Sequence, residues 1–438
     1  MENSLKKNIN NEGIFARKKA VEILIEILQN NRPLDSAFEI STKKSSHFSK
    51  LANEDKSFCR LLVSTTLRHL ISIDYLLNKF LSKPIKKTPI KVIMVLRVNI
   101  VQSFFLNTPD HAVVNTSVEL SGAKWKGLVN AVSREVLRNR EKAKKYLDES
   151  DKIPKWLLNR WRKNWHNNYT DLINEILILD PPIDLCIKNN ASHWAKKLNG
   201  KKIRNNSIRI NTSGLISKIN GYDDGEWWIQ DYSSQIPVTL MDIKEKDEVL
   251  DLCAAPGGKT AQLISLGAIV TSVDDNKKRL LRLEQNLKRL NYKTNIKNED
   301  IRNFSAEKTW SKILLDAPCS STGTLRKNPD IMHQKKEVDI LSLSKLQSDL
   351  LDAAWKLLKN NGILVYCTCS LEKDEGEYQI ESFLKRNKNS ILDKIDINEI
   401  DTKLKISTKN KWLRIFPGDL DFKGGNDGFF IARLKKIA

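Results

Sequence analysis

The spacing of apolar residues divides the chain into a helical part and a later part of a different character. Up to residue 146, apolar side chains recur every three or four positions, the period of an amphipathic helix, as in Ala20, Val21, Leu24, Ile27 and Leu28. Prolines at positions 33, 84, 89 and 109 interrupt this pattern, and strand-like alternation is missing. The pattern predicts an all-α domain of about five to seven helices over residues 13–146, preceded by a disordered tail at residues 1–12.

After residue 247 the pattern changes to short, continuous apolar runs separated by helical stretches. Runs of this kind, typical of buried parallel strands, occupy residues 248–252, 269–273, 312–315 and 362–366, and a final strand is expected at 428–434. Helical periodicity covers residues 276–290 and 343–358. Strands that alternate with helices predict a doubly wound, Rossmann-like α/β domain, which we assign to residues 231–438.

The segment between these two parts is rich in tryptophan and in basic residues. Six of the ten tryptophans fall here: Trp156, Trp161, Trp165, Trp194, Trp227 and Trp228. Aromatic side chains beside cations suit base stacking next to phosphate contacts. Core tryptophans with lysines on an exposed face explain the same pattern, and slightly better for any single tryptophan. We predict a small α/β connecting domain over residues 147–230, with a strand at 207–211.

Composition favours an anionic partner and a reducing compartment. Lysine and arginine total 74 against 53 acidic residues, a net charge of +21, which suits phosphate contacts but also an ordinary lysine-rich surface. Six cysteines in 438 residues do not form a disulfide framework. The polar start does not resemble a signal peptide, and the most apolar stretch, 92–106, contains Arg97, Asn99 and Gln102. We expect a cytoplasmic protein without a membrane span.

The first strand of the α/β part leads into a glycine turn, "DLCAAPGGKT" at 251–260. Ligands of an open α/β sheet bind beyond the carboxyl ends of its strands, and Gly257 and Gly258 allow a sharp turn there. The turn matches neither a dinucleotide fingerprint nor a phosphate loop. Asp274 ends the second strand and suits ribose hydroxyls, whereas Asp275 suits a helix cap. Asp300, after the third strand, suits adenine or is an ordinary loop acid. Acids without a phosphate clamp favour S-adenosylmethionine over a dinucleotide.

The fourth and fifth strands lead into "LLDAPCSSTG" (314–323) and "VYCTCS" (365–370), so Asp316, Cys319 and Cys369 are expected to converge. A thiolate that adds to carbon 6 of a cytosine makes carbon 5 nucleophilic, and a carboxyl group can assist at N3. Cysteines are more often small buried hydrophobes, as expected for positions 59, 186 and 253. Cys367 and Cys369 also have the spacing of a redox or metal pair, but the histidines form no cluster with them, and we expect no metal.

These motifs resemble the RNA cytosine-5 methyltransferase family that includes the bacterial Sun/Fmu (RsmB-type) enzymes and the eukaryotic NOL/NOP proteins. "NPD" (328–330) and "GNDGFF" (425–430) extend the resemblance over roughly residues 230–438. It implies that Cys369 is the nucleophile, that Cys319 assists breakdown of the covalent adduct, and that Asp316 contacts the cytosine. Cys367 receives no role. The resemblance implies these contacts to S-adenosylmethionine: Cys253, Ala254, Ala255, Pro256, Gly257, Gly258, Lys259, Asp274, Asp300 and Asp316.

The N-terminal part resembles the RNA-binding NusB helical fold through "HAVVNTSVEL" (111–120) and "KGLVNAVSREVLR" (126–138). A NusB-like domain joined to such a catalytic domain implies the Sun/Fmu branch and 16S rRNA as substrate, at a cytosine in a stem-loop near the ribosomal P site. We expect a monomer that acts on naked or early-assembly RNA. The basic loop 326–336 and the connecting domain are expected to grip nucleotides beside the target.

Two other classes of protein share some of these features. DNA cytosine-5 methyltransferases use the same addition chemistry, but their nucleophile follows a proline and would be Cys319 here. A protein for assembly or antitermination, with an inactive α/β domain, would need a helical RNA-binding domain alone. The second cysteine, Cys369, and the helical N-terminal domain argue against the first class. The full set Asp316, Cys319 and Cys369 argues against the second.

Overall fold

The computed structural model describes residues 2–44, 51–165, 169–178, 181–204, 206–212, 216–305, 308–400, 411–420 and 424–437. They divide into two compact units. The helical unit holds the chain up to residue 178 together with the segment Lys327–Lys335. The α/β unit holds the other described residues, apart from the segment 213–215, which is not described. The segment 147–230, for which a third domain is expected, is therefore shared between the two units.

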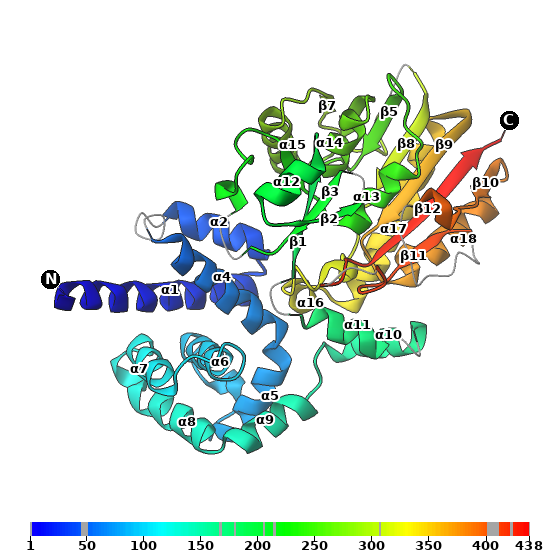
Figure 1. The fold of residues 1–438 in the computed structure, drawn as a ribbon. Helices are drawn as coiled ribbons and strands as arrows, with labels where there is room; N and C mark the ends of the chain where they lie inside the picture. Colours follow the sequence, from blue (N-terminus) through cyan, green and yellow to red (C-terminus); the bar gives the residue numbers. More distant parts are fainter. Residues whose placement is uncertain are drawn as a thin grey trace. The chain divides into compact units, whose positions relative to one another are not determined.

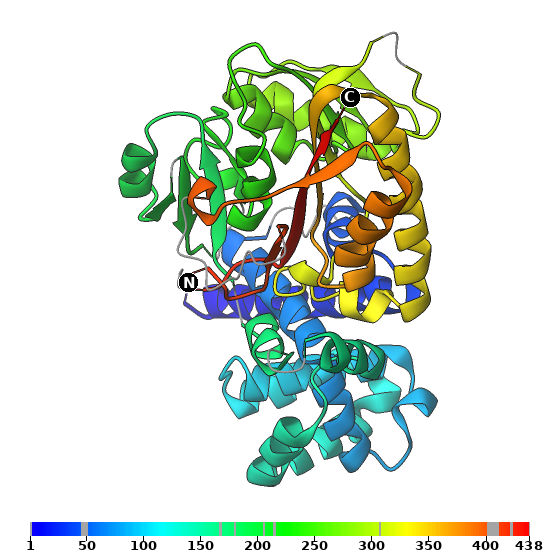
Figure 2. The ribbon, with the colours of Figure 1, turned by 90° about the vertical axis from the view of Figure 1, so that its right-hand side faces the viewer.

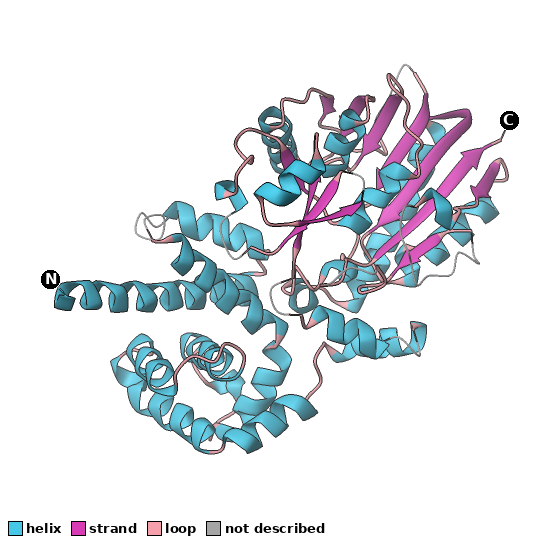
Figure 3. Ribbon diagram, in the orientation of Figure 1, coloured by secondary structure: helices cyan, strands magenta, loops and turns pink. Residues whose placement is uncertain are grey.

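The helical unit has no strand among its described residues (Figure 3). Its helices are α1 (Glu2–Asn30), α2 (Leu34–Lys44), α4 (Asn53–Arg68), α5 (Leu70–Phe80), η1 (Ile85–Lys87), α6 (Ile90–Phe104), α7 (Asp110–Leu120), η2 (Ala123–Trp125), α8 (Lys126–Arg138), α9 (Arg140–Glu149), α10 (Lys155–Asn164), α11 (Tyr169–Ile176) and α16 (Ile331–Gln334). Helices begin directly after Pro33, Pro84, Pro89 and Pro109, as expected. The helix α1 begins before residue 13, so there is no element boundary where the sequence places the end of a tail.

Breaks without a proline raise the number of helices above the expectation. Within the described part of 13–146, eight α-helices lie wholly or partly, against five to seven predicted. His69 separates α4 from α5, and Asn139 separates α8 from α9. Neither residue is a strong helix breaker, so the sequence alone carries no signal for these two breaks.

The apolar stretch 92–106 forms a helix in the core of this unit, as predicted. Residues 92–103 of α6 are all buried. The Asn99 amide donates hydrogen bonds of 3.0 Å to the hydroxyls of Ser117 and Ser133, and Arg97 pairs with Asp74 at 2.7 Å. The side chains of Arg97 and Asn99 therefore have protein partners, as buried polar groups require. Among the described helices, none has the length and hydropathy needed to cross a bilayer.

The α/β unit contains two sheets. The small antiparallel sheet has the order β2 (Lys201–Arg204), β3 (Ser207–Ile210), β1 (Ile183–Ile187), β4 (Trp227–Ile229). The large sheet has the order β10 (Ser390–Asp393), β12 (Phe429–Lys436), β9 (Leu358–Thr368), β8 (Trp310–Asp316), β5 (Glu248–Leu252), β6 (Ile269–Val273), β7 (Asn295–Lys297), and β11 (Leu413–Ile415) also pairs with β12 (Figure 1). Strands β5 to β9 are parallel and β12 is antiparallel to β9.

Helices cover both faces of the large sheet, because its strands are apolar on both sides. The remaining α-helices of the unit are α12 (Ala191–Lys197), α13 (Tyr232–Thr239), α14 (Gly258–Ser265), α15 (Lys277–Arg289), α17 (Glu337–Lys356) and α18 (Glu377–Arg386). On β8, Ile313 and Leu315 pack with Trp355 of α17, whereas Leu314 between them packs with Ile236 of α13. Figure 2 shows α17 and α18, in gold and orange, on one side of the strands and the green helices on the other.

The strand order places the predicted motifs together. The chain runs from β5 outward through β6 to β7, and then returns to the other side of β5 with β8 and β9. Such a reversal leaves a crevice at the carboxyl ends of the central strands, where ligands of α/β sheets bind. The loops after β5, β8 and β9 carry the glycine turn and the two cysteine motifs. The predicted fold class, an all-α domain with a Rossmann-like α/β domain, is confirmed.

Candidate active site

The glycine turn connects β5 to α14. Gly257 has a φ of +99°, and a Cβ there would lie 3.0 Å from Cγ of Leu283, so this position requires glycine. Gly258 begins α14, and the nearest atom to a Cβ built on it, Oε1 of Gln230, is 3.8 Å away. A Cβ at Gly258 would therefore make only ordinary van der Waals contact. The Cys253 thiol is largely buried, and burial raises its pKa, so it is not a reactive thiolate.

Asp274 lies at the end of β6, as predicted, with 2% of its surface exposed. Its carboxylate accepts the backbone N–H groups of Ala255 at 3.2 Å and of Asn276 at 3.0 Å, and thereby holds the glycine turn against β6. The alternative role for Asp275, capping the next helix, belongs to Asn276 instead, whose side chain accepts two backbone N–H groups at the start of α15. Asp275 is exposed.

Asp300 follows β7 and forms an ion pair with Arg302 through both of its oxygen atoms. The hydrogen bond from Arg302 lowers the pKa of this carboxyl, although the pair is partly exposed. Asp300 is therefore an ionised acid just after β7, as expected, but both of its carboxylate oxygen atoms already accept hydrogen bonds from Arg302.

The residues at this end fit the predicted cofactor. The glycine turn at the carboxyl end of β5 and the acid at Asp274 suit a nucleoside that carries a positive charge. Lys259 is the only basic residue in the turn 251–260, and its Nζ donates to Oδ2 of Asp316 at 2.8 Å. The turn therefore has no free cation to clamp a diphosphate, which argues against a dinucleotide.

Lys259 joins the glycine turn to the predicted catalytic acid. Its ammonium group is buried, donates to Asp316, and also donates to Oγ of Ser234 at 3.0 Å. Burial alone would lower the pKa of Lys259, but the charges of Asp316 and of the nearby cysteines outweigh it and the pKa is raised. The structure thus directs the side chain of Lys259, predicted as a cofactor contact, toward Asp316.

The two predicted catalytic cysteines meet although 50 residues separate them. Their Sγ atoms are 3.5 Å apart, and Oγ of Ser321 lies 3.4 Å from Sγ of Cys369. A hydrogen bond from the Cys319 thiol lowers the pKa of Cys369, whereas the same contact, with burial, raises the pKa of Cys319. Both cysteines are partly exposed. Within this pair, Cys369 is therefore the thiol that loses its proton more readily.

Asp316 shares this corner of the sheet. The register of β8 and β9 pairs Asp316 with Cys367, whose thiol donates to Oδ1 of Asp316 at 3.4 Å. The charge of Asp316 also acts on the pKa of Cys369. Asp316, Cys319 and Cys369 are thus brought together. Cys367 is fully buried against the carboxylate, so it is not half of a pair with Cys369.

The backbones of the motif loops touch behind the thiols. The N–H of Gly323 donates to the carbonyl of Cys369 at 2.9 Å, and the N–H of Gly428 donates to the carbonyl of Gly323 at 2.8 Å. A Cβ at Gly323 would lie only 2.2 Å from the carbonyl oxygen of Gly428, so only glycine permits this approach. The "GNDGFF" segment therefore supports both cysteine loops.

One contact expected of a basic residue with RNA is wrong, and most of the tryptophans follow the core interpretation. Arg326 is fully buried and pairs with Asp231 and Asp427 at 2.7 Å, so it cannot grip RNA. Four of the six tryptophans singled out are core residues rather than stacking platforms: Trp161, Trp194, Trp227 and Trp228. Trp156 and Trp165 are half-buried. The core interpretation of the tryptophans, rated slightly better from the sequence, holds for those four.

The sequence gives no sign of one residue at this site, Glu375 in η5 (Lys373–Glu375). It lies in the charged run "EKDEGE" (372–377), a pattern typical of a solvent-exposed face. In the structure Glu375 is fully buried and accepts hydrogen bonds from Ser320 and Ser370, the residues that follow the two cysteines. Its location could be found only from tertiary structure.

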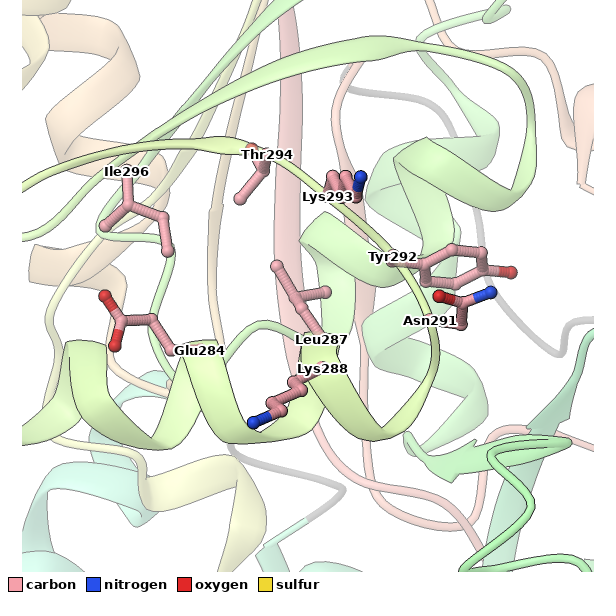
Figure 4. A pocket seen from close by; sticks show the side chains of 8 residues that line it. All are labelled: Glu284, Leu287, Lys288, Asn291, Tyr292, Lys293, Thr294 and Ile296. Atoms are coloured by element: carbon pink, nitrogen blue, oxygen red, sulfur yellow. The ribbon is translucent and has the colours of Figure 1, made fainter.

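A shallow pocket of about 400 Å³ lies elsewhere in the α/β unit, at the end of α15 and the following loop (Figure 4). Its lining includes Leu287, Tyr292 and Ile296 but none of the predicted site residues. Burial raises the pKa of Tyr292 to about 12. The described residues contain no cluster of three or more histidine, cysteine or acidic side chains able to hold a metal.

Comparison with known families matches both parts of the chain. The family model described as 16S rRNA methyltransferase RsmB/F matches residues 238–435, and the NusB family model matches residues 15–142. Ribosomal RNA small subunit methyltransferase B of Shigella sonnei (strain Ss046) is 32% identical over 412 residues, which cover 88% of this chain and 92% of that protein. The protein of the same name from Cronobacter sakazakii (strain ATCC BAA-894) is 31% identical over 99% of this chain and 100% of its own length.

Solved structures show the same fold. The crystal structure of PH0851 matches with a TM-score of 0.76 at 22% identity and covers 96% of this chain and 99% of that one. The crystal structure of NSun6 from Pyrococcus horikoshii with SFG matches with a TM-score of 0.57 at 20% identity, over 65% of this chain and 98% of that one.

Proposed function

Because this chain belongs to the 16S rRNA methyltransferase RsmB/F family, we propose that it methylates carbon 5 of one cytosine in 16S rRNA through a covalent cysteine adduct. S-adenosylmethionine is the cofactor, and when bound it supplies an electrophilic methyl group on its sulfonium. The observation that carries the proposal is the pair of sulfur atoms of Cys319 and Cys369, 3.5 Å apart beside the carboxylate of Asp316.

The cofactor is proposed to lie at the glycine turn. The stretch 253–259 follows the carboxyl end of β5, and Asp274 follows that of β6. The crevice in which ligands of an α/β sheet bind lies at this edge of the sheet. Asp274 has both oxygen atoms engaged by backbone N–H groups, so the ribose would use their remaining acceptor capacity. Asp300 would serve the adenine only if Arg302 moves from it.

Cys369 is the proposed nucleophile because its pKa is lowered while that of Cys319 is raised. Its sulfur forms a bond to carbon 6, and the electron pair of the ring double bond makes carbon 5 nucleophilic toward the methyl group. The negative charge that develops toward N3 requires a proton or a strong hydrogen bond. A carboxylate has no proton to donate, so Asp316 would first take one, and the ammonium group of Lys259, which donates to it at 2.8 Å, is the proposed source.

The adduct must then break down. A base removes the proton from carbon 5, the ring double bond forms again, and Cys369 leaves as a thiolate. Cys319 is the proposed helper in this step, because its Sγ lies within hydrogen-bond distance of the leaving sulfur and its pKa is the higher of the two. A thiolate that receives a hydrogen bond is a better leaving group.

The RNA must present the face of the base to Cys369, so the cytosine leaves its stack. A single-stranded loop of 16S rRNA, free of ribosomal proteins or at an early stage of assembly, meets this need at the lowest cost. The net charge of +21 supports a polyanionic substrate. We place the reaction in the cytoplasm, where the thiols stay reduced.

Two substitutions test the roles of the thiols. Cys369→Ala is expected to abolish methyl transfer from labelled cofactor to naked 16S rRNA and to retain cofactor binding. Cys319→Ala is expected to accumulate a covalent RNA–protein adduct that survives denaturing electrophoresis. An adduct that forms in Cys369→Ala but not in Cys319→Ala would reverse the two roles.

A bisulfite map of 16S rRNA made with and without the protein tests the position of methylation. One cytosine that becomes protected only with active protein supports the proposal. A folded protein that binds the cofactor but transfers no methyl group to 16S rRNA would favour a binding protein for assembly or antitermination instead.

A further inference from the structure

A carboxylate buried behind the two cysteines connects the loops that carry them. Glu375 follows β9 by only a few residues and has none of its surface exposed. Its backbone carbonyl accepts the hydroxyl of Tyr366 at 2.9 Å and the hydroxyl of Thr368 at 3.2 Å. The residue is therefore held firmly against the strand that leads to Cys369.

Four donors converge on the two carboxylate oxygen atoms. Oε1 accepts the backbone N–H of Ser320 at 2.9 Å and the amide of Gln347 at 3.0 Å. Oε2 accepts the hydroxyl of Ser370 at 2.5 Å and the hydroxyl of Ser320. Gln347 also donates to the carbonyl of Pro318 at 2.9 Å, so residues on both sides of Cys319 are held. Burial raises the pKa of Glu375, whereas the four donors favour its ionised, acceptor-only form.

The donors belong to the residues next to the nucleophile and its partner. Ser320 follows Cys319 directly, and Ser370 follows Cys369 directly. One oxygen atom, Oε2, receives the hydroxyls of both serines, which lie 3.1 Å from each other. The carboxylate thus fixes the separation of two loops whose sequence positions differ by 50 residues, and hydrogen bonds to a charged group are the stronger kind.

We propose that Glu375 is a positioning residue for methyl transfer, whose carboxylate holds Ser320 and Ser370 together and so keeps the thiols of Cys319 and Cys369 in contact. The proposal rests on the proposed function for its consequence in catalysis, but the geometry it asserts can be measured without RNA or cofactor.

Capture of the two thiols as a disulfide measures their separation directly. The azo compound diamide accepts two electrons and two protons from the pair and becomes a hydrazine, while the Cys319–Cys369 bond forms. Peptide mapping by mass spectrometry follows this bond in the full chain, and Cys319→Ala gives the background. Glu375→Gln is expected to slow capture about tenfold, since a displacement of about 1 Å separates groups that must meet. Glu381→Gln, an exposed residue of α18, is the matched control and should capture at the rate of the unmodified chain.

The sign of the change in capture rate distinguishes a change in the distance between the two sulfur atoms from a change in the pKa of Cys319. The charge of Glu375 raises the pKa of Cys319, so its loss alone would make that thiol more reactive and capture faster. Slower capture therefore reports a wider separation. A rate within twofold of the unmodified chain, or a faster one, would overturn the proposal.

A second set of variants removes the donors and leaves the carboxylate in place. Ser320→Ala and Ser370→Ala together should slow capture as much as Glu375→Gln does, and adding Glu375→Gln to them should have little further effect, because the three residues act as one unit. If the serine substitutions and Glu375→Gln instead slowed capture by factors that multiply in the combined variant, the residues would act independently and the proposal would be overturned. This set also decides the matter if Glu375→Gln fails to fold, as circular dichroism and cofactor binding would show.

The consequence for catalysis is tested separately. Glu375→Gln should methylate RNA about tenfold to a hundredfold more slowly, with unchanged dissociation constants for RNA and cofactor, and should accumulate covalent adduct because Cys319 is misplaced. If Glu375→Asp methylates RNA faster than Glu375→Gln, the carboxylate group itself, and not the packing of the side chain, is what turnover requires. If the unmodified protein transferred no methyl group, the proposed function would fail while thiol capture would still test the position of Glu375.

Discussion

The hydrogen bond between the two thiols predicts that Cys369 loses reactivity when its partner is removed. The Sγ atoms are 3.5 Å apart, and the thiol of Cys319 is the donor that lowers the pKa of Cys369. In Cys319→Ala this donor is gone, so the pKa of Cys369 should rise. Ser321, 3.4 Å away, remains as a weaker source of stabilisation.

The size of the effect follows from the energy of one hydrogen bond to a charged group. Such a bond contributes about 1.5–3 kcal/mol, and a contact between two sulfur atoms at this distance belongs at the lower end. At about 1.4 kcal/mol per unit, the pKa should rise by about one unit. Near pH 7 the thiolate fraction then falls about tenfold, whereas the higher basicity of the thiolate recovers about threefold in intrinsic reactivity, so alkylation should slow about threefold.

The assay is the rate of iodoacetamide alkylation at Cys369 between about pH 5 and 10, read by mass spectrometry of the cysteine peptides. Cys59 is an internal reference, since burial raises its pKa and it should not react in the folded protein. Cys319→Ser keeps a hydroxyl donor at the same position and should restore most of the rate.

Two results would refute this reasoning. One is a Cys319→Ala protein in which the alkylation rate and its pH midpoint at Cys369 are unchanged. The other is faster alkylation at Cys319 than at Cys369 in the unmodified chain, because the thiolate would then be on the opposite sulfur.

Three further predictions concern stability. Arg326→Met removes the guanidinium that pairs with the buried carboxylates of Asp231 and Asp427 and should destabilise the α/β unit by about 3–5 kcal/mol in denaturant unfolding; a loss below about 1 kcal/mol would contradict it. Asp330 accepts the N–H of Leu34 at the start of α2 at 2.9 Å, so Asp330→Ala should cost the helical unit about 1 kcal/mol, and Asp330→Asn clearly less. Burial lowers the pKa of His333 from 6.5, its value in the unfolded chain, to about 4. The neutral side chain therefore contributes fully to the free energy of unfolding above pH 6.5, and this contribution is lost as the pH falls toward 4. Unfolding at pH 5 should show up to about 2 kcal/mol of this loss, and His333→Gln should not show it.

Local pattern was sufficient wherever an element is buried on both sides. The apolar runs at 248–252 and 269–273 coincide with β5 and β6 to the residue, and the runs at 312–315 and 362–366 lie inside β8 and β9. A central parallel strand is covered on both faces and is therefore mostly apolar, so its sequence is easily recognised. The short strands β7, β10 and β11 lie near the sheet edges, and their sequences carry a weaker signal.

The helix boundaries divide in the same way. Prolines end or begin helices through their own covalent structure, and the boundaries at Pro33, Pro84, Pro89 and Pro109 were predictable for that reason. The breaks at His69 and Asn139 depend on how neighbouring helices pack, since neither residue forbids a helix by itself. Propensity is a weak influence that tertiary contacts override.

By itself, the sequence determined the chemistry available to this protein: thiols and a carboxylate at the ends of two neighbouring parallel strands, and a glycine turn at the end of a third. Only the tertiary structure decided which of these groups touch. It directs Lys259 to Asp316, pairs Cys319 with Cys369, and buries Arg326 and Glu375, two charged residues that the local pattern places at the surface. The reason is that a charge is buried only where distant segments supply its hydrogen-bond partners, and no local pattern of apolar and polar residues records those partners.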